Sequence, residues 1–206
     1  MEDSKTTFES LTTFNATFLT LILKLEGANT PVKFWPISLC NVIYKIITRV
    51  ITNKLKLLLP SLISPKQSIY VEGRKILYGI SLSHETIHSL KVTKKIRMLV
   101  KLDLSKALDK LNWKFLQKKL LSFAFNHVWT HLILNLKSST FFSILVNSSP
   151  SLTFKSSRGI CQGGPLSPFL FILTVEGLGR TINAMKSSQE IWGLSLHPNT
   201  MSHTHQ

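Results

Sequence analysis

The clearest pattern of hydrophobic and polar positions runs through residues 38–60, SLCNVIYKIITRVITNKLKLLLP. Apolar side chains recur there every three or four positions, with lysine and arginine between them; the apolar positions are Val42, Ile43, Ile46, Ile47, Val50, Ile51, Leu55 and Leu58. This spacing predicts an amphipathic helix with a basic outer face, closed by Pro60. A second helical pattern covers residues 80–90, ISLSHETIHSL.

The pattern then changes to alternation in residues 97–104, RMLVKLDL. Met98, Val100, Leu102 and Leu104 alternate there with Leu99, Lys101 and Asp103, which predicts a strand with Asp103 near its end on one defined face. Helical spacing returns in residues 113–123, 127–137 and 170–185, a β-hairpin is predicted over 139–156, and 158–168 is a loop rich in helix breakers. The predicted fold class is therefore mixed α/β (α+β).

The composition gives the chain a strong positive charge. The 206 residues, 44% of them hydrophobic, are enough for a substantial core, and the formal net charge is +15. Of the 25 lysines and arginines, 18 lie between Lys33 and Lys119, together with only four acidic residues. A polyanionic partner such as nucleic acid fits this distribution, and so does a solvated basic surface with no ligand.

Other broad classes are disfavoured by the sequence. The apolar run FLTLIL is far shorter than the roughly twenty residues that a membrane helix needs, so no transmembrane span is expected. Cys40 and Cys161 are the only cysteines, and the beginning MEDSKTTFES lacks an apolar signal core. We therefore expect a reducing, intracellular location in the nucleus or cytoplasm.

The segment KLDLSKALDK, residues 101–110, places Asp103 and Asp109 in the middle of the basic region. A carboxylate at a strand end in a basic field suits phosphoryl transfer, where magnesium is held by carboxylates and substrate phosphates. The plainer alternative is that Asp103 caps a turn and Asp109 occupies the first turn of a helix. Spacing alone does not decide between these interpretations.

Six segments together resemble the reverse transcriptase of LINE-type non-LTR retrotransposons, of the kind abundant in plants. They are NATFLTLILK, FWPISLCNVIYKIITRVITNKLK, LISPKQSIYVEGR, KLDLSKALDKLNW, FFSILVN and RGICQGGPLSPFLFIL. The likeness covers about residues 15 to 205 and keeps the order and spacing of the family. It implies the fingers and an incomplete palm of a right-hand polymerase in residues 15–206, preceded by a disordered N-terminus in residues 1–14.

The same resemblance implies RNA-directed DNA synthesis with two Mg²⁺ ions, an RNA template, a DNA primer and dNTPs. Asp103 matches the first metal-binding aspartate of the palm, which is the catalytic and metal-ligating position. The positions that match nucleotide-binding residues of the family are Arg74, Ser105, Lys106, Ala107, Leu108, Gln162 and Gly163. Asp109 matches an acidic position of the family that we do not expect to bind metal.

Several positions depart from the family pattern. Trp35 stands where an arginine is expected near phosphate, and Leu108 replaces the bulky aromatic residue that excludes ribonucleotides. Cys161 and Gly164 replace an arginine and an aspartate of the glycine-rich loop. The family's FADD motif is expected directly after Met201-Ser202-His203, but the sequence ends at Gln206, so a catalytically inactive remnant is expected.

Two alternatives stay open beside the polymerase interpretation. A basic surface can hold nucleic acid electrostatically without catalysis, which predicts a non-enzymatic nucleic-acid-binding remnant. More remotely, His84-Glu85-Thr86-Ile87-His88 matches the HExxH pattern of zinc hydrolases. An ordinary surface helix is the favoured interpretation of that segment, because no further glycine and histidine ligand pattern follows it.

Overall fold

The computed structural model describes residues 15–93 and 98–193, which form two compact units. Within these ranges, unit 1 is made of residues 15–55 and 106–171, and unit 2 of residues 56–93, 98–105 and 172–193. Two 21-residue helices, α2 (Val42–Leu62) and α7 (Ser167–Ser187), contribute to both units. The predicted disordered N-terminus, residues 1–14, lies outside the described residues.

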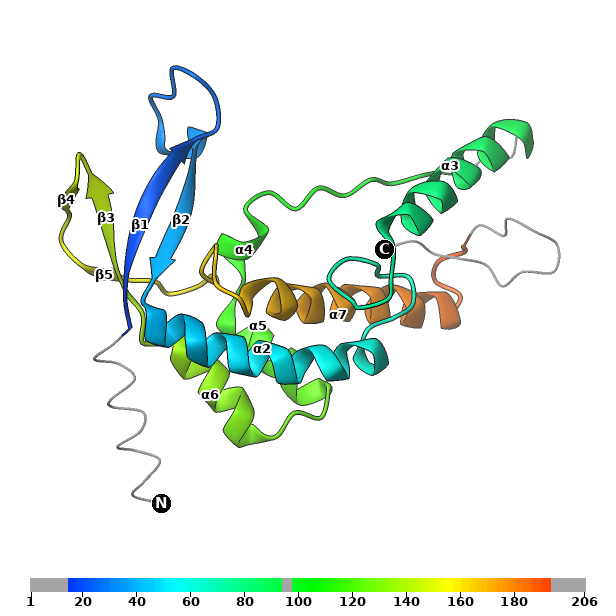
Figure 1. Ribbon diagram of the computed structural model, residues 1–206. Coiled ribbons are helices and arrows are strands. Elements are labelled where there is room, and N and C mark those ends of the chain that lie inside the picture. Colours follow the sequence, from blue (N-terminus) through cyan, green and yellow to red (C-terminus); the bar gives the residue numbers. More distant parts are fainter. Residues whose placement is uncertain (1–14, 94–97, 194–206) are drawn as a thin grey trace. The chain divides into compact units, whose positions relative to one another are not determined.

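A five-stranded mixed sheet belongs to unit 1 (Figure 1). Its strands are β1 (Ala16–Leu23), β2 (Phe34–Cys40), β3 (Phe141–Val146), β4 (Ser149–Pro150) and β5 (Phe154–Lys155). The order is β2-β1-β3-β4, with β5 also paired to β3. Strand β1 runs antiparallel to β2 and parallel to β3, whereas β4 and β5 return antiparallel to β3. The predicted hairpin is confirmed, with its second strand divided into two short pieces.

The sequence pattern did not predict β1 and β2. The run FLTLIL is apolar on nearly every position, so it lacks the alternation that marks a strand with one wet face. Its register is nevertheless well defined, from Thr17 opposite Cys40 to Leu23 opposite Phe34. This pairing places β2 at the edge of the sheet, beside β1, and positions Ser38 for the contacts described below.

The predicted helices of unit 1 form, and asparagine begins each of them. They are the first part of α2, together with α5 (Trp113–Ser122) and α6 (His127–Ser138). The side-chain oxygens of Asn41, Asn112 and Asn126 accept hydrogen bonds from backbone N–H groups in the first turn, at 2.7 to 3.2 Å. Such caps satisfy donors that have no partner within the helix, which explains why the helices begin there.

The packing of α5 against α6 builds much of the core of unit 1. Leu116 and Leu120 of α5 and Ile133 and Leu136 of α6 are at most 1% exposed. The helix pair is joined to the chain before β1 by Asn15, whose Nδ2 donates to the Leu136 carbonyl at 2.9 Å and to Ser139 Oγ at 2.8 Å. Both hydrogen bonds are buried, so they link segments that are distant in sequence.

The prediction that Pro60 closes α2 is wrong, because the helix continues to Leu62. The Ile63 N–H still donates to the Leu59 carbonyl at 2.9 Å. Proline removes only one hydrogen bond of the ladder here, and Arg74 donates to the Pro60 and Ile63 carbonyls at this end of the helix. The helix therefore ends two residues later than its sequence suggests.

In unit 2, the predicted helix at residues 80–90 forms the middle of α3 (Ile76–Thr93), but the predicted strand at 97–104 is wrong. Residues 98–104 adopt no regular secondary structure, and both alternating sets of side chains are exposed. A strand is stabilised by a paired neighbour, and within residues 98–104 the backbone pairs with none. Asp103 consequently lies exposed on an irregular segment rather than at a strand end.

The α/β character predicted from the sequence is confirmed. Within residues 15–93 and 98–193, no helix has both the length and the hydrophobicity required to cross a membrane.

Candidate nucleotide and nucleic-acid site

A glycine-rich loop, residues 159–164, is held on two sides by backbone hydrogen bonds within unit 1. On one side the Ser38 N–H of β2 donates to the Gln162 carbonyl at 2.9 Å. On the other side the Gly159 N–H donates to the Leu111 carbonyl at 2.8 Å and the Ile160 N–H to the Leu108 carbonyl at 3.0 Å. The loop that carries Gln162 and Gly163 is therefore fixed between β2 and the segment around residues 108–111.

The Gln162 side chain is oriented by Asp109. Its Nε2 donates to Asp109 Oδ1 at 2.8 Å, although 53 positions separate the two residues in the sequence. Asp109 lies in the four-residue helix α4 (Ala107–Lys110), where it occupies the first turn as the plainer alternative predicted. Because a carboxylate oxygen accepts the amide N–H, the amide oxygen of Gln162 remains available for another donor.

Two glycines of the loop have backbone conformations that favour glycine. Gly159 has φ of +85°, and a Cβ there would lie 2.6 Å from the Asp109 carbonyl oxygen. Gly163 has φ of +95°, and a Cβ there would lie 3.4 Å from the Ser38 carbonyl oxygen. The close approach at Gly159 explains how the loop reaches the α4 segment, since a side chain would push the two backbones apart.

A cavity of about 140 Å³ opens beside this loop. Asp109, Gln162, Lys137 and Arg158 contribute its charged and amide groups. Trp113 forms part of the wall and donates its indole N–H to the Gly159 carbonyl at 2.7 Å. The cavity thus combines an apolar wall with two basic side chains, one carboxylate and one amide, groups that can hydrogen-bond a polar organic ligand.

The sequence did not single out Lys137, which lies in α6 and is 3% exposed. Its Nζ donates to the Tyr44 hydroxyl at 2.8 Å and lies 5.5 Å from the centre of that ring. Nothing in the segment LILNLKSS distinguishes a buried lysine from a surface one. Only the packing of α6 against α2 and the loop shows that this ammonium lies inside the protein.

The other predicted nucleotide-binding residues are divided between the units. In unit 1, Lys106 is exposed with φ of +53°, and Ala107 and Leu108 are half-buried at the start of α4. In unit 2, Asp103 and Ser105 are exposed. The residues that the structure brings into one arrangement are therefore Leu108, Asp109 and Gln162, each by a hydrogen bond given above.

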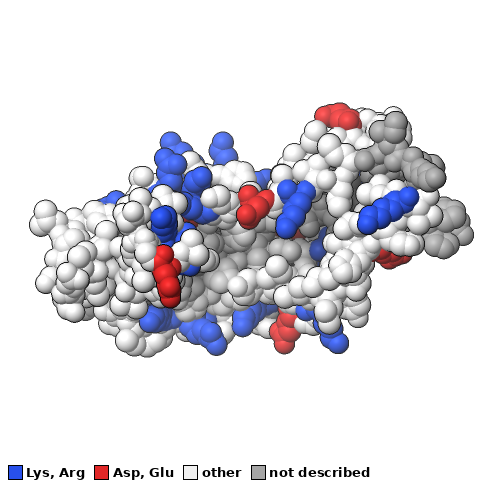
Figure 2. Space-filling view, turned by 90° about the horizontal axis from the view of Figure 1, so that it is seen from above, with Lys and Arg blue, Asp and Glu red and all other residues white. Residues whose placement is uncertain are grey.

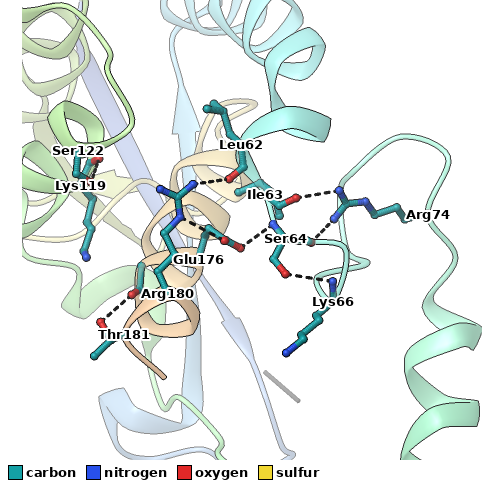
Figure 3. Close-up of polar contacts among 11 residues, drawn as sticks. Leu62, Ile63, Ser64, Lys66, Arg74, Lys119, Ser122, Glu176, Arg180 and Thr181 are labelled. Atoms are coloured by element: carbon teal, nitrogen blue, oxygen red, sulfur yellow. Dashed lines mark hydrogen bonds and ion pairs between the residues drawn. The ribbon is translucent and has the colours of Figure 1, made fainter. Parts of the chain in front are cut away.

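Arg74 of unit 2 is bound to backbone carbonyls (Figure 3). Its guanidinium donates to the carbonyls of Gln67 at 2.7 Å, Ile63 at 2.9 Å and Pro60 at 3.4 Å, and also to that of Ser64. These hydrogen bonds occupy the guanidinium donors of Arg74 and hold the turn after α2 in place. The phosphate contact that the resemblance implies for Arg74 stays a prediction.

The same turn is held by α7 within unit 2. Glu176, 4% exposed, accepts a hydrogen bond from the Ser64 N–H at 3.0 Å, and Arg180 donates to the Leu62 carbonyl at 3.0 Å (Figure 3). Arg180 Nε and Glu176 Oε1 form an ion pair at 3.5 Å. Arg74 lies on one side of the turn and the Glu176–Arg180 pair on the other, so residues 62–67 are restrained by side chains from two segments.

Basic side chains outnumber acidic ones on the face of the molecule shown in Figure 2. Trp35, which replaces an expected arginine, is 52% exposed, and Lys24 Nζ lies 5.1 Å from the centre of its ring. Lys24, which directly follows β1, thus supplies a positive charge near Trp35. The surface remains suited to polyanions.

The described residues provide few ligands for a metal ion. In the part of the chain that the structure describes, no three His, Cys, Asp or Glu side chains come together as a metal site. His84, Glu85 and His88 are exposed on α3, so the zinc-hydrolase alternative gains no support. Asp103 offers a single carboxylate and Asp109 is engaged by Gln162, so the described residues alone do not make up a magnesium site.

Comparison with known proteins defines the class to which this fold and site belong. A family model described as reverse transcriptase (RNA-dependent DNA polymerase) matches residues 24–194, so the chain belongs to the reverse transcriptase family. It is also similar to the transposon TX1 uncharacterized 149 kDa protein of Xenopus laevis, with 30% identity over 156 residues. That match covers 75% of this chain and 12% of the relative. The recognition as a reverse transcriptase of the non-LTR retrotransposon type is confirmed, and members of this family act on nucleic-acid templates with divalent metal ions.

Proposed function

We propose that this chain forms the template- and nucleotide-binding part of a retrotransposon reverse transcriptase, a protein that copies RNA into DNA. The observation that carries the proposal is the hydrogen bond between Asp109 and Gln162, in a loop fixed on both sides by backbone bonds. It leaves an oriented amide beside a cavity with two basic side chains, Lys137 and Arg158. With a volume of about 140 Å³ the cavity can take one part of a nucleotide, such as a phosphate group, whose oxygens basic side chains bind.

In this proposal each predicted residue keeps a separate role. Gln162 and Gly163 contact the incoming nucleotide, Leu108 lies under its sugar, and Ser105, Lys106 and Ala107 face its phosphates. Asp103, which belongs to unit 2, would offer one carboxylate to magnesium, and a phosphate contact of Arg74 remains a prediction. Magnesium, when bound, would neutralise charge on the triphosphate.

A binding measurement tests the nucleotide site directly. The full chain is mixed with a labelled RNA–DNA primer–template whose primer lacks a 3′-hydroxyl, and binding is followed by fluorescence anisotropy with Mg²⁺. We expect the next complementary dNTP to tighten duplex binding more than a mismatched dNTP does. The matched pair of variants is Gln162→Ala, which should remove this effect, and Gln117→Ala on α5, which should retain it. Equal effects of matched and mismatched dNTPs would refute the nucleotide site.

The net charge of +15 favours a second candidate, a nucleic-acid-binding protein without nucleotide recognition. The same assay distinguishes the two functions. Under this alternative the duplex is bound at low salt and released steeply as salt rises, with no response to any dNTP. Duplex affinity that does not change with salt would contradict both functions.

A further inference from the structure

The two cysteines of the chain lie together inside unit 1. Cys40 is the last residue of β2 and Cys161 belongs to the glycine-rich loop; they are 5% and 6% exposed, and both are free thiols. The hydrogen bond from the Ser38 N–H to the Gln162 carbonyl, at 2.9 Å, holds their two segments side by side. The thiols are within hydrogen-bonding reach of one another. The fold thus brings together two sulfur atoms that are 121 positions apart in sequence.

A buried cation lies next to this thiol pair. Lys137 is 3% exposed, and its Nζ donates to the Tyr44 hydroxyl at 2.8 Å. Among residues 15–93 and 98–193, Lys137 forms no ion pair with a carboxylate. A buried ammonium without an anion is unfavourable, and the thiolate of Cys161 is an anion that can compensate it.

The cavity beside the loop gives small molecules a route to this group. Cys161 and Lys137 both line the cavity of about 140 Å³, together with the charged side chains of Asp109 and Arg158. A volume of this size accommodates a molecule the size of a peroxide or a small alkylating reagent. Cys161, although only 6% exposed, therefore borders a space that small molecules can enter.

Electrostatics assign different roles to the two sulfurs. A hydrogen bond from the Cys40 thiol and the charge of Lys137 lower the pKa of Cys161 to about 6, although burial acts in the opposite direction. The same hydrogen bond and burial raise the pKa of Cys40. Burial lowers the pKa of Lys137 while a Cys161 thiolate raises it, so the two charges stabilise one another. Burial also raises the pKa of Tyr44, which keeps this phenol neutral as a hydrogen-bond partner.

We propose that Cys161 is a modification site for hydroperoxides and small electrophiles, and that its oxidation ends in a disulfide with Cys40. The Cys161 thiolate attacks one oxygen of the peroxide, the O–O bond breaks, and a sulfenic acid and hydroxide form. The Cys40 sulfur then attacks the sulfenic sulfur; the S–O bond breaks, and the thiol proton leaves with the hydroxyl as water. The two thiols lose two electrons, which the peroxide takes up.

The disulfide would join β2 covalently to the loop that carries Gln162. The modification site therefore adjoins the proposed nucleotide site, but it does not depend on nucleotide binding. It depends on the thiol pair, the buried lysine and the cavity.

Alkylation of the full chain with iodoacetamide tests the first part of the proposal. Trypsin cuts after Lys33, Lys45, Arg158 and Arg180, which places the two cysteines in separate peptides that mass spectrometry quantifies. In the folded protein at pH 7 we expect Cys161 to react about tenfold faster than Cys40, with a rate that rises through about pH 6. In urea the two rates should become equal. Equal rates in the folded protein, or no reaction of Cys161, would overturn the proposal.

Hydrogen peroxide tests the second part. The expected product in the wild-type chain is one pair of linked peptides, 34–45 and 159–180, lighter by two hydrogen atoms than the reduced pair. Cys40→Ser should trap a sulfenic acid on Cys161, detected as a dimedone adduct, whereas Cys161→Ser should leave Cys40 unmodified. Cys161→Ser with Cys40 still oxidised would contradict the assigned roles, as would disulfides formed only between chains.

A substitution of Lys137 tests whether its charge, rather than its packing, controls the reactivity of Cys161. Lys137→Met should move the midpoint of the Cys161 pH–rate profile upward by about one pH unit, towards the value of an ordinary thiol. The control Lys118→Met, which removes an exposed lysine of α5, should leave that midpoint unchanged. Identical midpoints in the two variants would refute the role of Lys137. If Lys137→Met unfolds, the comparison of folded and urea-treated wild-type protein still decides the proposal.

Discussion

Replacing Arg74 with alanine should loosen the turn after α2. In unit 2 the Arg74 guanidinium donates to the carbonyls of Gln67 at 2.7 Å and Ile63 at 2.9 Å, to that of Ser64, and more weakly to that of Pro60 at 3.4 Å. Three good hydrogen bonds at about 1 kcal/mol each give about 3 kcal/mol. Arg74 is half-buried, so water compensates part of the loss and about 2 kcal/mol remains.

Hydrogen exchange measures this loss locally. The Ile63 and Gln67 amides donate to the Leu59 and Ser64 carbonyls, so both report on the turn. A loss of about 2 kcal/mol should accelerate their exchange roughly 30-fold in Arg74→Ala.

Two further variants distinguish hydrogen bonding from charge. Arg74→Lys keeps the positive charge but not the planar group with several donors, so we expect it to recover only a minor part of the protection. The neighbouring exposed Lys75→Ala removes the same charge without touching the carbonyls and should have no effect. The reasoning is refuted if Arg74→Ala changes exchange by less than about twofold, or no more than Lys75→Ala does.

Three other substitutions have expected outcomes in urea denaturation of the full chain. Gly159→Ala should lower the free energy of unfolding by about 3 kcal/mol, because its φ is +85° and its Cβ would lie 2.6 Å from the Asp109 carbonyl oxygen; an unchanged denaturation midpoint would contradict this. Asn15→Ala should cost about 2 kcal/mol by removing two buried hydrogen bonds, whereas Asn29→Ala, on the exposed β1–β2 connection, should cost much less. Cys161→Arg should cost about 3 kcal/mol or more beside buried Lys137, and Cys161→Met, which adds volume without charge, should cost less.

The sequence predicted those elements whose pattern is local. Helices α5, α6 and α7 and the hairpin of β3 were predicted because their hydrophobic spacing and turn residues are contained in short windows. The prediction that Pro60 ends α2 was wrong, because a proline near the end of a helix removes one hydrogen bond without ending the helix. In residues 98–104 the predicted strand does not form. Alternation predicts a strand, but a strand also requires a neighbouring strand with which to pair.

The site was predicted less completely than the fold. The resemblance indicated Gln162 and Gly163, but the bond between Gln162 and Asp109 spans 53 positions and follows only from the folded chain. Arg74 was expected near phosphate, and its contacts with four carbonyls are not encoded in any local pattern. Lys137 was missed because lysine in a sequence normally indicates a surface position.

Lys137 also changes how the departure from the family pattern at Cys161 is understood. Taken alone, cysteine in place of an arginine is a lost positive charge. In the structure, position 161 is buried beside a lysine that is itself buried, so an arginine there would place two like charges in a region of low dielectric. Cysteine avoids this conflict, and its thiolate compensates the ammonium. In this chain, an arginine at position 161 would therefore require a second substitution that removes the positive charge of Lys137.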